Sequence, residues 1–362
     1  MKVLTVLGTR PEIIRLSRII AALDGQCDHL LVHTGQNQDV LLNDVFFAEL
    51  GVRAPDVALG IRGTSFGDQV GKIIAAVEGV LERERPDRVV ILGDTNSGLA
   101  GFVACRMGIP VYHLEAGNRC FDDRVPEEVN RRVIDHSSAV LMPYTERSRS
   151  NLLREGIASD RIHVVGNPIL EVLESQETAI AASDVLQRIG VEHGRYFLAT
   201  THRQENVDLE ERLRSIVASL VRLHEEFSMP VIWSIHPRTQ SKLAAFGVVV
   251  PEGTVSVMPP LGFHDFVALE RHAACVLSDS GTVQEECCIM KVPNVTLRDV
   301  TERPETVECG SNILAGVAPS DVLRSVGVAL ARPPAWTPPP EYLVRTVSAT
   351  VARVVLGFRA GE

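Results

Sequence analysis

Residues 113–128 read HLEAGNRCFDDRVPEE, a segment in which five carboxylates stand close to only two arginines. The charged side chains of the segment are Glu115, Arg119, Asp122, Asp123, Arg124, Glu127 and Glu128. Crowded carboxylates raise one another's pKa, so that one can donate a proton while a neighbour remains a base. The segment is therefore a candidate for general acid–base chemistry. A solvated acidic loop is the alternative explanation of the same pattern.

The elements that must position this segment follow a regular pattern. Short β-branched apolar runs alternate with segments of helical period, such as 66–83 and 96–107, which is typical of parallel βαβ units. The strands predicted in the first half are 3–8, 30–35, 88–94, 110–115, 138–144 and 162–167. Those predicted in the second half are 196–202, 230–236, 254–260, 274–280 and 292–299. We therefore predict an α/β fold with two Rossmann-like, doubly wound domains.

The boundary between the two domains is predicted at the Gly-Asn-Pro sequence at 166–168. The predicted domains are 1–167 and 168–340. Residues 332–343 contain five prolines and are not predicted to form a helix. A final helix over 343–358 could return to either domain, and we expect it to join the N-terminal one.

Polar clusters follow directly after the predicted strands of both halves. They are GTRPE (8–12), GDTN (93–96), HLEAGNR (113–119), THRQEN (201–206), HPR (236–238), SDSGT (278–282) and RDVTERPE (298–305). Ligands of doubly wound folds bind beyond the carboxyl ends of the strands. We therefore predict an active site in the cleft between the two domains.

The sequence offers one candidate phosphate site. It contains no G-x-G-x-x-G or G-x-x-x-x-G-K-[ST] motif, which disfavours a tightly bound dinucleotide and a P-loop nucleotide. In SDSGTVQEE (278–286) a strand ends and a helix begins near Ser280, so that backbone N–H groups can face an anion. Capping of the helix by Ser280 alone is the structural alternative.

Composition limits the class of protein. A chain of 362 residues can bury two cores, and a net charge of −10 disfavours nucleic acid or an anionic membrane as a partner. The seven cysteines lack the spacing of a metal site and suggest reduced thiols in a reducing compartment. The sequence shows neither the apolar core of a signal peptide nor a run of about 18 apolar residues. We expect a cytoplasmic protein without a bound metal.

Six sequence blocks carry a family resemblance. The blocks are GTRPEIIRLSRI, LGDTNS, HLEAGNR followed by RVPEEVNRR, THRQEN, SDSGTVQEE and RDVTERPE. In order and spacing they resemble the signature blocks of the non-hydrolysing UDP-N-acetylglucosamine 2-epimerase family. The resemblance implies a GT-B architecture, a UDP-sugar in the interdomain cleft, inversion at C2 of the sugar and a homodimer. HLEAGNRCFDDRVPEE, LLREGI and PLGFHDF also resemble the UDP-N-acetyl-L-fucosamine synthase branch of the family.

The implied reaction explains the need for carboxylates. C2 of an N-acetylhexosamine has no adjacent carbonyl, so its hydrogen becomes acidic only as UDP leaves C1 and a 2-acetamidoglucal forms. Acid–base groups are then needed on both faces of the sugar. Motif matching implies that the catalytic residues are Asp94, Glu115, Glu127 and His202.

Each carboxylate also has a structural alternative. Asp94 could cap the next helix, and Glu127 could be a first-turn acid that the helix dipole favours. Glu115 could form a buried ion pair with Arg119 or Arg10.

The resemblance also implies the residues that bind UDP and the substrate. They are Arg10, Arg15, Phe266, Ser280, Gly281, Thr282, Glu286 and Arg303, with His236 and Arg119 as further candidates. Glu286 matches the acid that binds the ribose hydroxyls, and Phe266 the aromatic residue that contacts uracil. No cofactor is implied. The loop HTGQNQDVLLND (33–44) departs from the form found in substrate-activated members, and we predict that substrate activation is not needed.

Three functions remain open at this point. The first is interconversion of UDP-GlcNAc and UDP-ManNAc, which ranks ahead because RDVTERPE is nearer the common family form. The second is 2-epimerisation of UDP-2-acetamido-2,6-dideoxy-L-talose to UDP-N-acetyl-L-fucosamine. The third is a GT-B glycosyltransferase, which would share the fold and the UDP site but need an acceptor.

Overall fold

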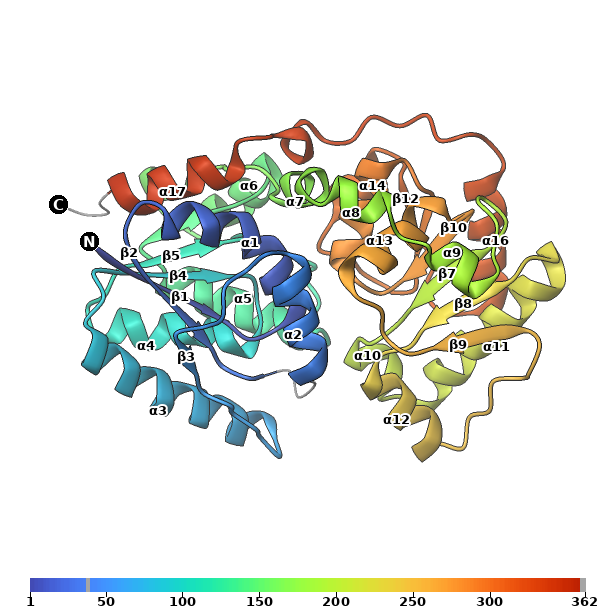
Figure 1. Ribbon diagram of the computed structural model, residues 1–362, viewed down its shortest axis with the longest axis horizontal. Coiled ribbons are helices and arrows are strands. Elements are labelled where there is room, and N and C mark those ends of the chain that lie inside the picture. The colour runs from blue at the N-terminus through green and yellow to red at the C-terminus, as the bar shows by residue number, and fades with distance from the viewer. Residues whose placement is uncertain (37–39, 359–362) are drawn as a thin grey trace. The chain divides into compact units, whose positions relative to one another are not determined.

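The computed structural model describes residues 1–36 and 40–358, and for 40–43 it describes the backbone only. The chain divides into two compact units (Figure 1). Unit 1 contains Met1–Ser175 and the segment that starts at Pro340, and unit 2 contains Gln176–Pro339. Each unit has its own parallel sheet covered by helices.

Unit 1 is built on a six-stranded sheet, in the described residues, with the order β3-β2-β1-β4-β5-β6. Its strands are β1 (Lys2–Leu7), β2 (Asp28–His33), β3 (Val57–Ala58), β4 (Arg88–Leu92), β5 (Val111–Leu114) and β6 (Val140–Met142). Its helices are α1 (Arg10–Asp24), α2 (Val40–Glu49), α3 (Phe66–Glu84), α4 (Ala100–Arg106), α5 (Pro126–Ser137), α6 (Glu146–Arg154), α7 (Ile169–Ser175) and α17 (Val347–Gly357), with 3₁₀ turns η1 (Asn96–Leu99), η2 (Ser159–Arg161) and η3 (Pro340–Leu343). All strand pairs are parallel, and the strand order is that of the Rossmann fold. The chain changes its direction of winding between β1 and β4. Doubly wound folds bind ligands at this point, between the loops that follow the two strands.

The apolar strands of unit 1 are covered on both faces. Leu4 and Val6 of β1 belong to a core that includes side chains of α3 and α4. Figure 1 shows α3 and α4 on one side of the sheet and α1 and α17 on the other. The last helix of the chain therefore packs on unit 1, where it contacts α1.

Unit 2 repeats this architecture with the order β12-β11-β10-β7-β8-β9. Its strands are β7 (Phe197–Thr200), β8 (Val231–Ser234), β9 (Val255–Met258), β10 (Cys275–Ser278), β11 (Asn294–Thr296) and β12 (Asn312–Leu314). Its helices are α8 (Glu177–Ala181), α9 (Val185–Ile189), α10 (Gln204–Val207), α11 (Glu210–Phe227), α12 (Pro237–Ala245), α13 (Phe263–His272), α14 (Gly281–Met290), α15 (Pro304–Glu308) and α16 (Pro319–Leu330). Its strand pairs are also parallel, and the winding reverses between β7 and β10. The polar blocks THRQEN and SDSGT follow these two strands.

One predicted strand is wrong. Residues 162–167 contribute a single isolated bridge, from Ile162 to Leu141 of β6. The segment then ends at Gly166, whose φ of +90° turns the chain away from the sheet. The short strands β3 and β12 were not predicted, because two or three residues are too few to show an alternating pattern.

The ends of the two units also differ from the expected positions. Unit 1 extends to Ser175 rather than to 167, because α7 packs against α1. The final helix begins at Val347 rather than at 343, and the last prolines of the proline-rich segment lead into the turn η3.

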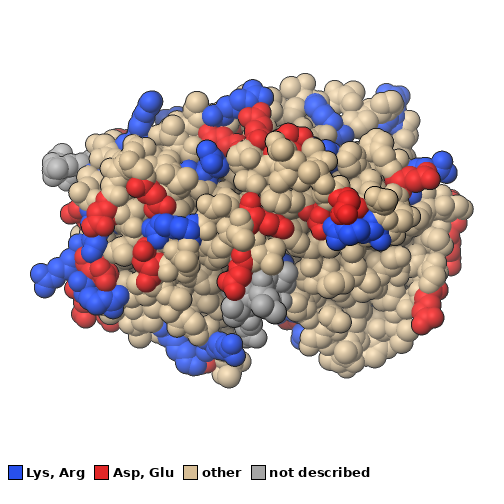
Figure 2. All heavy atoms as spheres, viewed as in Figure 1, with Lys and Arg blue, Asp and Glu red and all other residues tan. Residues whose placement is uncertain are grey.

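The surface is mixed in charge. Figure 2 shows Lys and Arg interspersed with Asp and Glu on the face in view. This is the pattern of a solvated surface, whereas proteins that bind a nucleic acid backbone gather basic side chains on one face. No helix within 1–36 and 40–358 is both long and apolar enough to cross a membrane.

Candidate active site

Glu115 stands at the carboxyl end of β5 in an unusual backbone conformation. Its φ is 64°, in the left-handed region that side chains other than glycine rarely adopt. Its N–H donates to the carbonyl of Met142 at 3.1 Å, which continues the sheet ladder for one more residue. The carboxylate lies over Gly93, where a Cβ would come within 3.4 Å of Oε2. Strained residues of this kind cluster at functional sites, and this one aims a carboxylate across the end of the neighbouring strand.

Glu115 forms a buried ion pair with Arg15 of α1. Arg15 Nη1 donates to Glu115 Oε2, and the two side chains are only 4% and 7% exposed. Asn118 Nδ2 donates to Oε1 at 3.3 Å, and Ser148 Oγ donates to Asn118 Oδ1 at 2.8 Å. Of the two predicted partners, Arg119 is therefore wrong for this carboxylate, because its guanidinium pairs with Asp135 and Glu155. Arg15, expected to contact UDP, lies against the candidate catalytic acid.

Arg119 belongs to a different buried network. Its Nη2 contacts Asp135 at 2.8 Å and Glu155 at 2.5 Å. His113 Nδ1 lies 2.8 Å from the second oxygen of Asp135. Burial raises the pKa of Asp135, but His113 and Arg119 outweigh it and hold that pKa below its ordinary value. In this arrangement Arg119 stabilises the turn after β5 and is not paired with Glu115.

Asp94 follows β4 and Gly93, beside Glu115 in the sheet, since Leu92 of β4 pairs with Leu114 of β5. Asp94 does not cap the next helical turn, because Thr95 occupies the N-cap position of η1. Its Oδ2 instead accepts from Arg131 Nε at 2.8 Å and pairs with Arg131 Nη2 at 2.6 Å. The carboxylate is thereby oriented from α5.

Glu127 and Glu128, at the start of α5, have different roles. Glu127 is partly exposed in the first turn. Glu128, which the sequence did not single out, is fully buried and accepts from the N–H groups of Cys120 and Phe121 at 3.0 and 3.1 Å. Although burial raises the pKa of Glu128, these N–H groups and Arg131 lower it below the ordinary value. Glu128 thus holds the loop that joins the two candidate acids.

Glu12 is a buried acid that the sequence did not single out. Its Oε2 accepts from the N–H groups of Gly8 and Thr9 at 3.0 and 2.8 Å, and its Oε1 accepts from Thr95 Oγ1 at 3.1 Å. Burial raises the pKa of Glu12 to about 7, against the effect of these hydrogen bonds. The capping-box spacing of Thr9 and Glu12 was the available signal. Glu12 ties the loop after β1 to the residue that follows Asp94.

Arg10, the other N-terminal arginine expected to support UDP, begins α1 and is partly exposed. Its Cζ lies 5.8 Å from the ring centroid of Phe46, within the range of a cation–π contact.

In unit 2 the structure brings His202 and His236 together. Their ring centroids are 5.7 Å apart. His202 Nδ1 lies 3.3 Å from Asp279 Oδ1, and Asp279 also accepts from the N–H of Arg203 at 3.0 Å and from Asn206 Nδ2 at 3.0 Å. Asp279 is fully buried and was not singled out, although it lies in the SDSGT block. It orients the half-exposed imidazole of His202.

The predicted phosphate turn forms the start of α14. Ser280 occupies the N-cap position, but its side chain makes no capping hydrogen bond, so capping does not account for the serine. A Cβ at Gly281 would come within 2.9 Å of Glu302 Oε1. Thr282 is buried in the first turn. Helix N–H groups at this end face outward from a ten-residue helix and can bind an anion.

Arg303 lies buried at the N-cap of α15 and forms an ion pair with Glu285 of α14. Glu286 is 3% exposed and lies beside Glu270, also buried. Burial, together with the negative charge of Glu286, raises the pKa of Glu270 well above its ordinary value. Phe266 of α13 is half-buried rather than part of the core.

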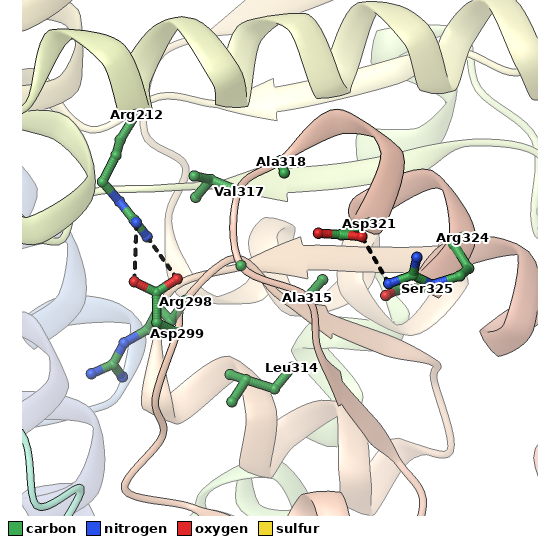
Figure 3. A pocket seen from close by; sticks show the side chains of 11 residues that line it. Arg212, Arg298, Asp299, Leu314, Ala315, Val317, Ala318, Asp321, Arg324 and Ser325 are labelled. Atoms are coloured by element: carbon green, nitrogen blue, oxygen red, sulfur yellow. Dashed lines mark hydrogen bonds and ion pairs between the residues drawn. The ribbon is translucent and has the colours of Figure 1, made fainter.

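A separate open pocket lies in unit 2 where β12 leads into α16 (Figure 3). Figure 3 shows Arg212 facing Asp299 and Asp321 facing Arg324, and each pair is joined by an ion pair, at 3.0 and 2.8 Å. None of the predicted site residues lines this pocket. Across the residues that the structure describes, no three His, Cys, Asp or Glu side chains are grouped to hold a metal ion.

Comparison with known proteins agrees with this geometry. The sequence profile of the UDP-N-acetylglucosamine 2-epimerase family matches residues 21–352. A UDP-N-acetylglucosamine 2-epimerase of Methanocaldococcus jannaschii is 43% identical over 351 residues, which cover 94% of this chain and 95% of the relative. The crystal structure of UDP-GlcNAc 2-epimerase from the same organism, in complex with UDP-GlcNAc and UDP, has a TM-score of 0.94 at 40% identity and covers 98% of this chain and 99% of that chain. A UDP-2,3-diacetamido-2,3-dideoxy-D-glucuronate 2-epimerase of Pseudomonas aeruginosa is 36% identical over 337 residues, 92% of this chain and 93% of the relative. These matches confirm the predicted fold class.

Proposed function

The chain belongs to the UDP-N-acetylglucosamine 2-epimerase family, and on that basis we propose that it interconverts UDP-GlcNAc and UDP-ManNAc by inversion at C2. The observation that carries the proposal is the placing of two carboxylates at the ends of neighbouring strands. Asp94 follows β4 and Glu115 follows β5, and the Glu115 carboxylate reaches over Gly93, the residue before Asp94. Two acids at one edge of a sheet suit a reaction that removes a proton and returns another.

The chemistry proceeds by elimination and re-addition. The C1–O bond breaks with its electron pair moving to the diphosphate of UDP, a carboxylate takes the C2 proton, and a C1–C2 double bond forms. A second acid then protonates C2 from the opposite face while UDP returns to C1. We assign this acid–base work to Asp94 and Glu115, which follow the neighbouring strands β4 and β5, and to Glu127 at the start of α5, the helix whose Arg131 pairs with Asp94. A carboxylate near C1 also stabilises the developing positive charge there.

The side chains around these acids support the assignment. Arg15 beside Glu115 and Arg131 beside Asp94 both favour the ionised carboxylate, the form that accepts a proton. Glu127 is partly exposed in the first turn of α5, so it is the candidate for access to substrate from that helix.

UDP binding is assigned to unit 2. The N-terminus of α14 at Ser280–Thr282 offers N–H groups to a phosphate, and Arg303 lies next to Gly281, with its Cζ 3.6 Å from where a Cβ would stand. Glu286, buried in the first half of α14, remains the candidate that accepts the ribose hydroxyls, and its negative charge is one cause of the raised pKa of Glu270 beside it. Phe266, half-buried on α13, remains the candidate for the uracil.

His202 is assigned to the departing diphosphate. Asp279 lies against Nδ1 of His202 and orients the imidazole at the carboxyl end of β7. His236 lies next to it and extends the same polar surface.

We also propose the assembly in which these residues act. Each unit presents its candidate residues near the carboxyl ends of its own strands, which is where doubly wound folds bind ligands. The family likeness supports a cytoplasmic homodimer that needs no cofactor. The absence of substrate activation stays a prediction, since residues 37–39 of the loop concerned lie outside the described residues.

Two other sugars are the relevant competitors. The 6-deoxy sugar of the fucosamine branch carries a methyl group at C5, and the substrate named for the Pseudomonas relative carries a carboxylate there. Both undergo the same inversion at C2. The choice among these sugars therefore depends on contacts to C3–C6 of the ring, where their substituents or configuration differ, and not on the inversion at C2 that they share.

A substrate panel tests the proposal. The purified protein is incubated with UDP-GlcNAc, with UDP-2,3-diacetamido-2,3-dideoxy-D-glucuronate, or with UDP-2-acetamido-2,6-dideoxy-L-talose, each without an acceptor, and the 2-epimers are separated by ion-pair chromatography. We expect UDP-GlcNAc to reach a mixture with UDP-ManNAc without net release of UDP. If the protein converts one of the other sugars but not UDP-GlcNAc, the proposed substrate is wrong. Release of UDP that requires an added acceptor would indicate a glycosyltransferase.

A further inference from the structure

Cys288 and Cys309 of unit 2 lie side by side although 21 positions separate them in the sequence, and their sulfurs are 3.7 Å apart. Cys288 is buried in the last turn of α14, and Cys309 is partly exposed at the C-cap of α15. Trp336 Nε1 donates to the carbonyl of Cys288 at 3.0 Å, so the proline-rich segment packs next to the pair. Neither sulfur has a role in the proposed epimerisation.

The two thiols differ in acidity in a way that suits a reactive pair. The contact with the Cys288 sulfur lowers the pKa of Cys309 to about 6 against the effect of burial, and hydrogen bonds with Ser311 and the positive charge of Lys291 act in the same direction. The same contact, together with burial, raises the pKa of Cys288 above its ordinary value. Near neutral pH Cys309 is therefore a partly exposed thiolate beside a protonated thiol.

Other cysteines of the chain differ from this pair. Cys275 and Cys287 are fully buried, and burial raises the pKa of Cys275 to about 12 and that of Cys287 well above its ordinary value. Both are expected to be inert. Cys105 is exposed on α4 of unit 1 and serves as a matched control for simple accessibility.

We propose that Cys288 and Cys309 are a dithiol site that reacts with hydroperoxides and closes to an intrachain disulfide. The Cys309 thiolate attacks a peroxide oxygen, the O–O bond breaks, and Cys309 becomes a sulfenic acid with release of hydroxide, which takes up a proton as water. Cys288 then attacks the Cys309 sulfur, loses its proton and expels a second water. Two thiols and one hydrogen peroxide give one disulfide and two waters. The sulfurs must approach from 3.7 Å to about 2.05 Å, a movement that side-chain rotation and a small helix shift can supply.

The position of the pair links it to the assigned UDP site, and this part of the inference rests on the proposed function. Cys288 ends the helix that begins at Gly281, and Cys309 ends the helix that begins after Arg303. The buried ion pair of Arg303 with Glu285 already joins the two helices. Drawing their C-terminal ends together shifts their N-terminal groups, so the oxidised protein is expected to bind UDP about fivefold more weakly or worse.

The site is tested on the full chain with hydrogen peroxide as the probe. We expect the loss of two hydrogens by intact mass and a cross-linked peptide that joins Cys288 to Cys309. Cys288→Ala should stop at a sulfenic acid on Cys309 that dimedone traps, and Cys309→Ser should react at the slow rate of an ordinary thiol. Cys105→Ser should behave as the wild type. Thermal unfolding of each variant checks that it is folded, and Cys288→Ser replaces Cys288→Ala if the alanine variant unfolds.

The outcomes separate the two parts of the inference. Absence of the 288–309 cross-link, or dimedone labelling of Cys105 as fast as of Cys309, would refute the dithiol site. A disulfide that forms but leaves UDP affinity unchanged, measured by calorimetry before and after oxidation, would refute the coupling to the UDP site. Failure of the reduced wild type to bind UDP would count against the proposed function and not against the disulfide.

Discussion

Arg131 offers a sharp test of how unit 1 holds its candidate acids. Its guanidinium is 3% exposed and joins Asp94, at 2.8 and 2.6 Å, to Glu128, at 2.8 Å. Asp94 is a candidate catalytic acid, and Glu128 holds the loop at Cys120 and Phe121. We predict that Arg131 is a positioning residue for Asp94, and two substitutions separate its charge from its geometry.

The expected magnitudes follow from burial. Arg131→Met removes the buried cation of the fully buried Glu128 and leaves it only the exposed Arg132 at 3.5 Å, which should destabilise unit 1 by about 3 kcal/mol and lower its Tm by roughly 10 °C. Arg131→Lys keeps the charge, but one ammonium group cannot span both carboxylates. We expect it to cost about 2 kcal/mol of stability and to lower kcat by about 10- to 100-fold through misplacement of Asp94, with little change in KM.

The assay combines thermal unfolding with initial rates on UDP-GlcNAc. Arg124 provides the matched control, because it lies on the same loop and pairs with Asp122 at 2.6 Å but is 72% exposed. Arg124→Met and Arg124→Lys should change stability by no more than about 1 kcal/mol and leave kcat unchanged. The reasoning fails if Arg131→Met unfolds at the wild-type temperature, or if Arg131→Lys retains the wild-type kcat.

Three further predictions follow from single side chains. Glu127→Gln should lose turnover by about 100-fold or more while UDP affinity is kept, and full activity of the variant would remove this residue from the catalytic assignment. Gly281→Ala should weaken UDP binding about tenfold, or about 1.4 kcal/mol by calorimetry, because the new Cβ would lie 2.9 Å from the buried Glu302 carboxylate. The control Gly327→Ala, whose Cβ would lie in open space on α16, should leave UDP affinity unchanged. Burial raises the pKa of Glu12 from 4.5 to about 7, so the folded state binds the proton of this carboxyl group more tightly than the unfolded chain does. The free energy of unfolding that the bound proton contributes is therefore lost as the pH rises from about 4.5 to 7. Because glutamine does not titrate, the stability of Glu12→Gln relative to the wild type should increase by up to about 3 kcal/mol as the pH rises from about 4.5 to 7. Parallel plots of Tm against pH for the two proteins would contradict this.

The fold was accessible from the sequence because its central strands are apolar on both faces. A run such as 3–8 has no polar alternation, so it indicates a buried parallel strand, and β1 lies there. The edge strands β3 and β12 are too short to give such a signal. Residues 162–167 have the composition of a strand, but a glycine at positive φ ends the extended segment after a single bridge.

The candidate site was predictable in residue type and not in pairing. The position of Glu115 at a strand end follows from the pattern of apolar runs. Its partner Arg15, however, lies 100 residues earlier in the sequence, on α1. Arg119, which is near in sequence, points into a separate network because Gly117, with a φ of +78°, turns the chain between the two residues. Nearness in the sequence therefore does not make Arg119 the partner of Glu115, since the turn geometry decides which side chains meet.

The structure gives different environments to two acids that are neighbours in the sequence, and helix geometry is the reason. Glu127 and Glu128 are adjacent and identical in type, but successive helix positions point about 100° apart. One faces the loop and is buried, and the other remains partly exposed. Composition alone cannot assign the two roles, whereas the position of the helix can.

The central claim is that the protein removes and returns a proton at C2 of a UDP-N-acetylhexosamine. Incubation with UDP-GlcNAc in D₂O, followed by ¹H NMR of the sugar, tests this directly. We predict loss of the C2 proton signal, incorporation of deuterium at C2, and a mixture of gluco and manno products with UDP still attached at equilibrium. Retention of the C2 proton with no manno product would contradict the claim.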